Sequence, residues 1–516
     1  MSLAAKDRVA LTPDDIALAD ERQELSWLQL DRMLNRVVNR IRDYRLSDDR
    51  RIAIFAHNSV ETAVAYLGSL LAGVSFVPIS YHLTVDELVY ILKESGARLV
   101  LAGPETVDTA LRAGAIAGVD MVVGWRAPPE GGMESWDDWI AQGSDAEPPT
   151  DLVPRPQLHF TSGTTGRPKA VETPPTVFPY LANMAELAEF QKRRAARTGL
   201  ISPGLIVSPM YHAGPIASVR AVIGGVSMVI LSRFDAEKTL AAIDRYRVRS
   251  TMMVPTQFLR LLSLPQGTRA KYDVSSLVQV THTGAACPPD VKRRMIDWFG
   301  RVLTELYGAT EAGTTNMITS DEWLRKPGSV GRTIKPYEVV VMDEEGRICG
   351  PNEEGILHFR DGTGRGVVYH CRAGANGSTG SGTGIFTLGD IGYVDDDGYV
   401  FITDRASDMI VSGGVNIYPA EIERELIAYP GVADIAVIGV PNAEMGEEVK
   451  ALIVPTDADS PPTEADLDTF CRERLAGYKC PRSFEFRSDI GRNDLGKVNK
   501  RSLRRPYWGS DRTIGG

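Results

Sequence analysis

Residues 51–79 read RIAIFAHNSVETAVAYLGSLLAGVSFVPI, and this stretch decides the fold class. Two apolar runs, Arg51–Ala56 and Val74–Ile79, have the length of buried strands, and Val60–Leu71 between them has the length of a helix. The same alternation of strand and helix continues to Leu101. Because such alternation is typical of parallel sheets covered by helices, we expect an α/β fold.

The composition indicates a large globular protein. The chain has 516 residues, of which 43% are hydrophobic and 24% charged, and this excludes a disordered or collagen-like chain. Its 57 basic and 67 acidic residues give a net charge of −10, which argues against a nucleic-acid partner. The 49 glycines are more than usual, and glycine lets a backbone approach a ligand closely. We therefore expect a small-molecule partner.

Cysteine usage and hydropathy predict a cytoplasmic location. The five cysteines are scattered and form no C-x-x-C pair, so free thiols in a reducing compartment are expected. The longest uncharged stretch, Thr62–Val85, contains Gly68, Gly73 and Pro78, and it is interpreted as a buried helix followed by a strand. The first residues show no apolar run typical of a secretion signal. No stable membrane anchor is expected.

A change of pattern near Asp404 predicts two domains. Residues 1–404 should form a large N-terminal domain with parallel sheets flanked by helices plus a β-subdomain, and residues 405–516 a small mobile C-terminal α+β domain. The segment Ala373–Gly384 is almost entirely Gly, Ser, Thr and Ala, and it is expected to be a mobile loop. The elements expected in the small domain are a helix at Pro419–Tyr429, strands at Val432–Val440 and Glu448–Val454, a helix at Glu464–Ala476 and a strand at Ser483–Phe486.

The segment Thr161–Lys169, TSGTTGRPK, follows a predicted strand and has the composition of a phosphate-binding loop. Glycines and hydroxyl side chains let backbone N–H groups converge on phosphate oxygens, and Lys169 adds a positive charge. A Walker motif is excluded because it needs the lysine to open directly into a helix, whereas Lys169 starts another apparent strand. The composition alone leaves open that this segment is an ordinary turn.

Seven further motifs follow TSGTTGRPK along the chain. They are Pro209–His212 (PMYH), Gly284–Ala286 (GAA), Tyr307–Glu311 (YGATE), Gly389–Asp390, Asp404–Arg405, Ser412–Gly414 (SGG) and Gly496–Lys497. In this order and spacing, the set resembles the adenylate-forming superfamily of acyl-CoA synthetases, luciferases and nonribosomal adenylation domains. The resemblance implies an enzyme that activates a carboxylic acid as an acyl-AMP, releases pyrophosphate and then transfers the acyl group to CoA.

By the resemblance, several motifs contribute to one nucleotide site. Tyr307 is expected beside adenine, Thr310 at the α-phosphate, and Asp390, helped by Arg405, at the ribose. Glu311 is expected to bind Mg²⁺, a cation that favours carboxylate and phosphate oxygens. The implied cofactors are ATP, Mg²⁺ and CoA. The residues expected to bind ATP or AMP are Thr161, Ser162, Gly163, Thr164, Thr165, Gly166, Lys169, Gly284, Ala285, Ala286, Tyr307, Gly308, Ala309, Asp390 and Arg405.

The resemblance also assigns the catalytic and CoA-binding groups. Lys497 is expected to bridge the acid and the α-phosphate during adenylation, with Thr310 and Glu311 at the phosphates and His212 in the acyl pocket. The small domain is expected to rotate between the two half reactions. Its hinge falls at Ser407, where the family usually has Asp or Lys. The residues expected to bind CoA are Ser412, Gly413, Gly414 and Lys479.

The choice of acid is left open by the sequence. Small residues around the inferred pocket leave room for a bulky acyl group, and Asp404–Glu423 is most similar to bacterial fatty-acyl and steroid or bile-acid side-chain CoA ligases. The alternatives are an acyl-AMP ligase that loads a carrier protein and a nucleotide-binding homologue without catalysis. The chain ends at Gly516 with no carrier domain, which favours CoA. A homodimer is left open.

Overall fold

The computed structural model describes residues 5–44, 46, 51–128, 131–161, 168–198, 202–343, 345–364, 369–370, 384–405, 408–412, 415–442, 445–475, 477–494 and 496–508. The chain divides into two compact units. The first comprises Met1–Thr283, Arg293–Thr314 and Arg365–Ser381, and the second comprises Gly284–Lys292, Thr315–Gly364 and Gly382–Gly516. The predicted loop at 373–383 lies outside the described residues, and the boundary at 404–405 stays a prediction.

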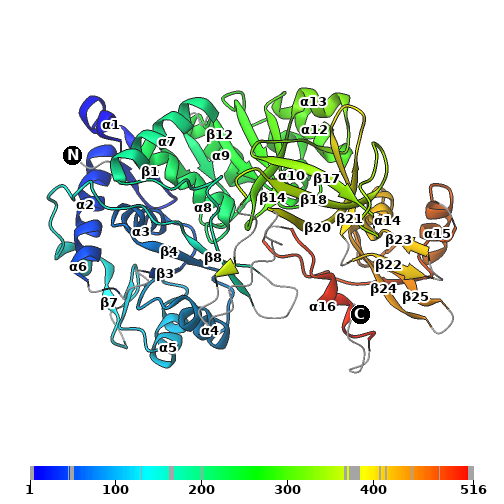
Figure 1. Cartoon of the computed structure of the whole chain (residues 1–516), viewed down its shortest axis with the longest axis horizontal. Helices are drawn as coiled ribbons and strands as arrows, with labels where there is room; N and C mark the ends of the chain where they lie inside the picture. Colours follow the sequence, from blue (N-terminus) through cyan, green and yellow to red (C-terminus); the bar gives the residue numbers. More distant parts are fainter. Residues whose placement is uncertain are drawn as a thin grey trace. The chain divides into compact units, whose positions relative to one another are not determined.

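The predicted βαβ unit is confirmed in the first unit, where α3 lies beside β3 and β4 (Figure 1, blue). Every residue of α3 (Val60–Leu71) is buried, so this apolar segment is a core helix. Its first turn is capped by the Ser59 hydroxyl, which accepts from the Thr62 N–H. The sheet has the order β4-β3-β5-β6-β7, all parallel. Its strands are β3 (Arg51–Phe55), β4 (Ser75–Ile79), β5 (Leu99–Ala102), β6 (Met121–Gly124) and β7 (Glu134–Ser135).

A second sheet of the first unit runs β14-β13-β12-β10-β11-β1-β2, and its neighbouring strands are parallel up to β1. Only β1 and β2 pair antiparallel. In α/β sheets ligands bind beyond the carboxyl ends of the strands, which is where the YGATE motif ends β14. The strands are β1 (Ile16–Ala19), β2 (Glu24–Ser26), β10 (Gly204–Ile206), β11 (Met228–Ile230), β12 (Ser250–Met253), β13 (Gln279–His282) and β14 (Leu303–Ala309).

Helices pack on these sheets and enclose the main apolar clusters. A capping box at Ser26 and Gln29 starts α2, and left-handed glycines end α4 and α5. The remaining helices up to Phe299 are α1 (Lys6–Leu11), α2 (Trp27–Asp43), α4 (Val85–Ser95), α5 (Val107–Ala117), α6 (Trp136–Ala141), α7 (Met184–Thr198), α8 (Ala213–Val219), η1 (Arg220–Gly224), α9 (Ala236–Tyr246), α10 (Pro255–Leu262), α11 (Gln266–Arg269) and α12 (Pro289–Phe299).

The second unit contains an antiparallel sheet of order β17-β18-β20-β21-β16-β15. This sheet matches the predicted β-subdomain. Its strands are β15 (Gly313–Thr319), β16 (Ser329–Thr333), β17 (Tyr337–Met342), β18 (Gly355–Asp361), β20 (Ile385–Val394) and β21 (Val400–Arg405), with α13 (Ser320–Arg325) between β15 and β16.

The C-terminal residues of the second unit form the predicted α+β structure with an apolar cluster of its own. Helix α14 (Pro419–Leu426) ends before the predicted Tyr429. Pro430 disfavours helical geometry at Tyr429 itself. Helix α15 (Glu464–Arg472) also ends earlier than predicted. The other elements are α16 (Lys500–Arg504) and the strands β22 (Ile410–Ser412), β23 (Val415–Ile417), β24 (Val432–Asn442), β25 (Gly446–Pro455) and β26 (Ser483–Phe486).

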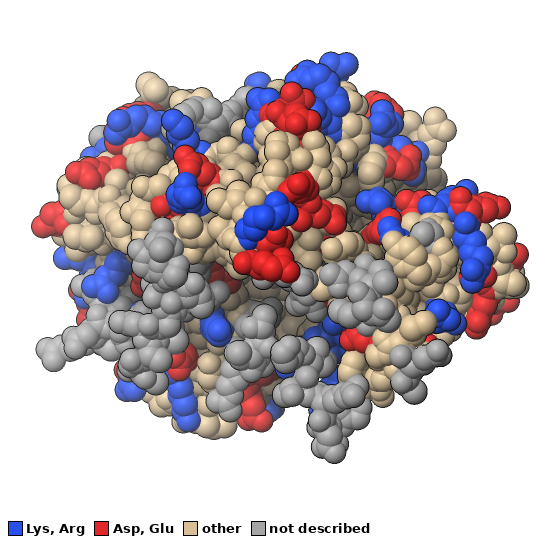
Figure 2. All heavy atoms as spheres, turned by 45° about the vertical axis from the view of Figure 1, so that its right-hand side comes forward, with Lys and Arg blue, Asp and Glu red and all other residues tan. Residues whose placement is uncertain are grey.

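In the described part of the chain, no helix is both long enough and apolar enough to cross a bilayer. On the face shown in Figure 2, basic and acidic side chains are interspersed. The described side chains on that face form no large basic area.

Candidate active site

The two ends of the TSGTTGRPK loop are held together by a hairpin of the first unit. Thr161, the last residue of β8 (Leu158–Thr161), lies directly opposite Lys169, the first residue of β9 (Lys169–Glu172). The hydroxyl of Tyr90 donates to the carbonyl of Pro168 at 3.1 Å. Ser162, Gly163, Thr164, Thr165 and Gly166 lie outside the described residues. The hairpin therefore fixes where the predicted phosphate loop begins and ends, and the loop itself stays a prediction.

The YGATE motif forms a tight turn at the end of β14. The Ala312 N–H donates to the Ala309 carbonyl at 3.2 Å, and the Thr176 hydroxyl donates to the Ala312 carbonyl at 3.1 Å. A side chain on Gly308 would overlap the carbonyl oxygen of Gly313, so the motif needs glycine at this position. Gly313 itself has a φ of +79°, which favours glycine.

The turn presents the predicted nucleotide residues at the protein surface. Tyr307, Ala309, Thr310 and Glu311 are each partly exposed. A hydroxyl and a carboxylate are thereby held one residue apart on a fixed turn, where a ligand can reach both. This arrangement suits contact with a phosphate and its accompanying cation.

Buried polar residues follow the same two strands toward the turn. Glu305 on β14 pairs in register with His282 on β13, and the Glu305 Oε2 to His282 Nε2 distance is 3.8 Å. His282 is fully buried, and its ring lies 5.3 Å from that of Phe258. Because side chains alternate along a strand, Glu305 points to the same face of β14 as Tyr307. The Glu305 carboxylate and the His282 imidazole beside it thus lie just before the YGATE motif.

His212 lies in a cluster of aromatic rings in the first unit. Its ring is 4.1 Å from that of Tyr211, and Tyr211 meets Tyr81 edge-on at 5.2 Å. Tyr81 in turn stacks on His57 at 3.8 Å. His212 is also the N-cap residue of helix α8, which begins at Ala213. The predicted imidazole is therefore one member of a larger aromatic wall, and His57 and Tyr81 were not found from the sequence.

Asn58 holds the PMYH segment in place. Its Oδ1 accepts from the Met210 N–H at 2.7 Å, and its Nδ2 donates to the carbonyls of Ser208 and Leu231 at 3.0 and 3.1 Å. Asn58 is buried, so these bonds are not exchanged for water. Asn58 comes directly after His57, and it is a positioning residue that no sequence motif marked.

Asp390 and Arg405 are neighbours in the second unit. They lie opposite each other on the antiparallel strands β20 and β21, and Asp390 is 4% exposed. Gly389 has a φ of +79°, and its N–H donates to the Thr387 hydroxyl at 3.0 Å. The unusual Thr387–Leu388–Gly389–Asp390 sequence is thus accommodated by a turn within the strand. The register brings together the two residues expected at the ribose.

Lys497 lies in a short loop closed by backbone hydrogen bonds. The Asn493 N–H donates to the Lys497 carbonyl at 3.0 Å, and the Gly496 N–H donates to the Asn493 carbonyl at 2.7 Å. Gly496 has a φ of +74°, which explains the glycine of the Gly-Lys pair. The Lys497 side chain is exposed. A rigid loop that carries an exposed ammonium group suits the catalytic role expected of Lys497.

The residues expected at CoA lie at different places in the C-terminal structure. Ser412, the first residue of the SGG motif, ends β22 and lies opposite Val415 on β23. Lys479 forms two hydrogen bonds with the Glu421 carboxylate, at 2.8 and 2.7 Å, and this contact raises the pKa of Lys479. Ser407, Gly413 and Gly414 lie outside the described residues. The hinge and most of the SGG motif therefore stay predictions.

The GAA motif begins two residues after β13, at the start of the second unit. Gly284 has a φ of +92°, so this position favours glycine. Ala285 is partly exposed and Ala286 is exposed.

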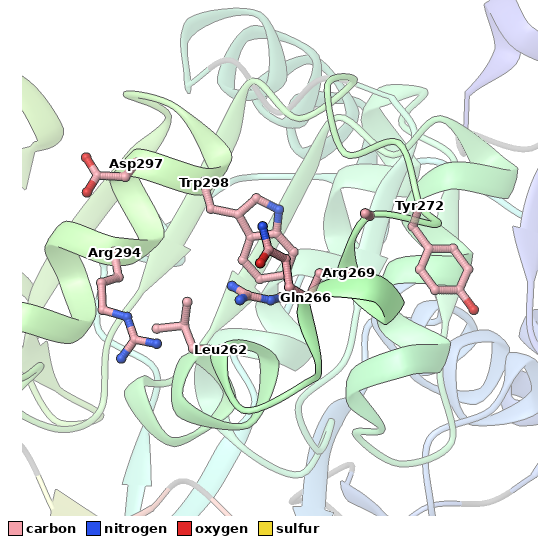
Figure 3. A pocket seen from close by; sticks show the side chains of 8 residues that line it. Leu262, Gln266, Arg269, Tyr272, Arg294, Asp297 and Trp298 are labelled. Carbon is pink, nitrogen blue, oxygen red and sulfur yellow. The ribbon is translucent and has the colours of Figure 1, made fainter. Parts of the chain in front are cut away.

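A surface pocket of about 510 Å³ lies apart from all these motifs in the sequence. Figure 3 shows Arg269 close to Trp298, with the guanidinium carbon 5.1 Å from the ring centre. The lining comes from α10, the residues around α11, and α12, and includes none of the predicted site residues. We do not assign this pocket to the active site.

Comparison with known proteins identifies the family. Residues 5–367 match the AMP-binding enzyme family, and residues 421–497 match the AMP-binding enzyme C-terminal domain. The chain belongs to the AMP-binding enzymes, within the adenylate-forming superfamily. The predicted resemblance is therefore confirmed.

Relatives of this AMP-binding enzyme match it over almost its whole length. A feruloyl-CoA synthase from Amycolatopsis is 32% identical, with 97% of each chain covered. A 2-succinylbenzoate–CoA ligase from Bacillus licheniformis is 30% identical and covers 96% of this chain and 98% of its own. The structure of ATP-bound MatB from Rhodopseudomonas palustris is 29% identical, with a TM-score of 0.79 and 96% of each chain covered. These matches extend across both the large and the C-terminal regions.

The donor groups of the AMP-binding enzyme fit a magnesium ion that is held together with a nucleotide. Glu311 supplies one partly exposed carboxylate on a fixed turn, and Mg²⁺ in such sites is bound by one or two carboxylates plus phosphate oxygens. Within the described ranges, no group of three or more His, Cys, Asp or Glu side chains is arranged to hold a metal. Glu311 stays the predicted Mg²⁺ ligand.

Proposed function

We propose that this AMP-binding enzyme is an acid:CoA ligase that acts on a fatty or bulky carboxylic acid. It would form an acyl-AMP with release of pyrophosphate, and then an acyl-CoA with release of AMP. The observation that carries the proposal is the end-to-end similarity to relatives named as CoA ligases, which includes the C-terminal region up to Lys497. The scattered cysteines support a cytoplasmic location.

In adenylation, the residues of this chain position charges rather than act as nucleophiles. The TSGTTGRPK loop and Thr310 would bind phosphate oxygens, and Glu311 would hold Mg²⁺, which reduces the negative charge of the phosphates. Lys497 would lie between the carboxylate and the α-phosphate, because a fixed ammonium group offsets the repulsion of two anions that must meet. His212 and Tyr211 would form one wall of the acyl pocket.

In the second half reaction, the C-terminal residues would present CoA to the acyl-AMP. The β22–β23 hairpin that carries the SGG motif would contact the CoA chain, and Lys479 would contact its phosphates. Ser407 would supply the backbone rotation that moves the C-terminal domain between its adenylation and thioester-forming orientations. A serine lacks the charge usual at this hinge. The equilibrium between the two orientations of the C-terminal domain should therefore differ from that of relatives.

A panel of carboxylic acids tests the proposal. Acetate, long-chain, aryl and sterol acids would each be incubated with ATP, Mg²⁺ and CoA, and AMP release would be measured. CoA-dependent AMP release with at least one fatty or bulky acid is expected. AMP release only when a carrier protein replaces CoA would favour the carrier-loading alternative, and ATP binding without AMP release for any acid would leave a non-catalytic homologue.

A further inference from the structure

Arg220 is a fully buried arginine of the first unit with no carboxylate partner among the described residues. Its Nε donates to the Ala217 carbonyl at 3.4 Å, and its guanidinium carbon lies 5.3 Å from the Phe178 ring centre. Neither Nη1 nor Nη2 has a hydrogen-bond acceptor in the described structure. A buried positive charge without a counter-charge is strongly unfavourable. A ligand that carries a negative charge would offset this cost.

Two further buried polar groups, Tyr66 and His159, lie near enough to this guanidinium to interact with it electrostatically. The Nε2 of His159, which is 4% exposed, and the hydroxyl of Tyr66, which is 1% exposed, have no hydrogen-bond partner within the described ranges. Burial, together with the nearby His212 and Arg220, lowers the pKa of His159 to about 3. His159 is therefore neutral at physiological pH and supplies no counter-charge. Arg220, His159 and Tyr66 together have several unused donors and no anion.

The position of Arg220 relates this cluster to the proposed acyl pocket. Helix α8 begins after His212 and ends at Val219, and Arg220 follows directly at the start of η1. At a helical rise of 1.5 Å per residue, the Cα atoms of His212 and Arg220 are about 12 Å apart along the helix axis, a span that an extended chain of about ten carbons could cover. An acid whose reacting carboxylate lies near His212 could therefore extend its far end toward Arg220.

We propose that Arg220 binds a second carboxylate at the far end of the substrate, which is therefore an elongated dicarboxylic acid. This inference rests on the proposed function, which places the reacting carboxylate near His212. A guanidinium binds a carboxylate through two parallel hydrogen bonds, which would use both Nη atoms and neutralise the buried charge. The Tyr66 hydroxyl and His159 would donate to the remaining lone pairs. A ketone oxygen would accept one bond but would leave the charge uncompensated.

Matched pairs of acids test this assignment. Hexanedioate, decanedioate and tetradecanedioate would be compared with their monocarboxylic counterparts and with 9-oxodecanoate, by kcat/KM for CoA-dependent AMP release. The wild-type enzyme should prefer a diacid over its monoacid at least tenfold. Arg220→Met should lower kcat/KM for the diacid by about 10- to 100-fold without lowering it for the monoacid, as expected for the loss of a charged hydrogen bond. Arg220→Lys should restore part of the diacid activity.

Binding without turnover gives a second readout. The preferred diacid should raise the melting temperature of the wild-type enzyme and of Arg193→Met, which removes an arginine that is 74% exposed, but not that of Arg220→Met. If Arg220→Met does not fold, the Arg220→Lys variant tests the inference instead, because it keeps the positive charge and loses the bidentate hydrogen bonding to a carboxylate. Its diacid activity should then fall relative to its monoacid activity.

Three results would overturn the inference while leaving the proposed function intact. They are a wild-type preference for monoacids, a preference for the oxo acid over every diacid, and an equal effect of Arg220 substitution on both acid classes. In each of these cases CoA-dependent AMP release would persist. A wild-type enzyme that releases AMP with no acid in either panel would instead reject the proposed function, and the inference with it.

Discussion

Arg492 and Asp434 form a bidentate ion pair that anchors the loop carrying Lys497. The Arg492 Nε and Nη2 donate to the Asp434 carboxylate at 2.6 and 2.7 Å, and Nη1 donates to the Gly496 carbonyl at 2.7 Å. Planar two-bond pairs of this kind fix orientation as well as charge. Arg492 therefore holds the residue immediately before the proposed catalytic lysine.

We predict that Arg492→Gln slows adenylation by about tenfold, because a small displacement of a positioned group has a large effect on rate. Acid-dependent pyrophosphate release measures this step. Thioester formation from supplied acyl-AMP should change little, and Asp434→Asn should have a weaker effect in the same direction. Equal slowing of both half reactions would indicate general unfolding of the C-terminal structure and would reject a positioning role.

Lys497→Ala should have a larger and equally one-sided effect. Without the ammonium group, nothing from this loop offsets repulsion between the carboxylate and the α-phosphate, so adenylation should fall by orders of magnitude. Thioester formation from acyl-AMP and CoA should be retained. The side chain is exposed, so the melting temperature should be unchanged. Loss of both half reactions to the same extent would contradict this role for Lys497.

The core of the fold could be predicted because apolar runs and their spacing are local properties. The helix Val60–Leu71 and the strand Ser483–Phe486 have the predicted bounds, and the family motifs placed Asp390 beside Arg405. The positioning residues could not be predicted. Asn58 is a single asparagine in the loop after a strand and belongs to no motif. The role of Arg492 depends on its ion pair with Asp434, which is 58 residues away in the sequence.

Gly308→Ala should disturb the YGATE turn. A Cβ at this position would overlap the Gly313 carbonyl, so the backbone must shift, at a cost of about 1–3 kcal/mol in unfolding free energy. Denaturant unfolding measures that cost, and ATP-dependent AMP release should fall with it. Gly267→Ala is the matched control, since a Cβ there meets no atom within 4 Å. Equal stability of the two variants would show that the turn tolerates a side chain.

The buried His159 should make the protein less stable in mild acid. Its folded pKa of about 3 is below the ordinary 6.5, so between these values the unfolded chain binds a proton that the folded chain does not. The contribution of His159 to the unfolding free energy should therefore be constant above pH 6.5 and should decrease as the pH falls below it, by about 1.4 kcal/mol per pH unit at most.

His159→Gln should remove this part of the acid dependence. Urea unfolding from neutral pH down to about pH 4 measures the slope, and the slope of the variant should be smaller by about 1 kcal/mol per pH unit. His82→Gln, which replaces an exposed imidazole, is the control and should keep the wild-type slope. Parallel curves for His159→Gln and the wild type would show that this imidazole is protonated equally in both states.

Substitutions of Lys479 and of Glu421 should have opposite effects on the KM for CoA. The two hydrogen bonds between them leave Lys479 only 23% exposed in its side chain, so binding of a CoA phosphate would compete with the Glu421 carboxylate. If Lys479 contacts CoA, Lys479→Ala should raise the KM for CoA by about tenfold, as expected for loss of a charged contact. Glu421→Gln should lower that KM, because the ammonium group would then be released.

Neither substitution should change the rate of pyrophosphate release during adenylation. A similar rise in the KM for CoA in both variants would mean that the pair only stabilises α14, and Lys479 would then have no role at CoA.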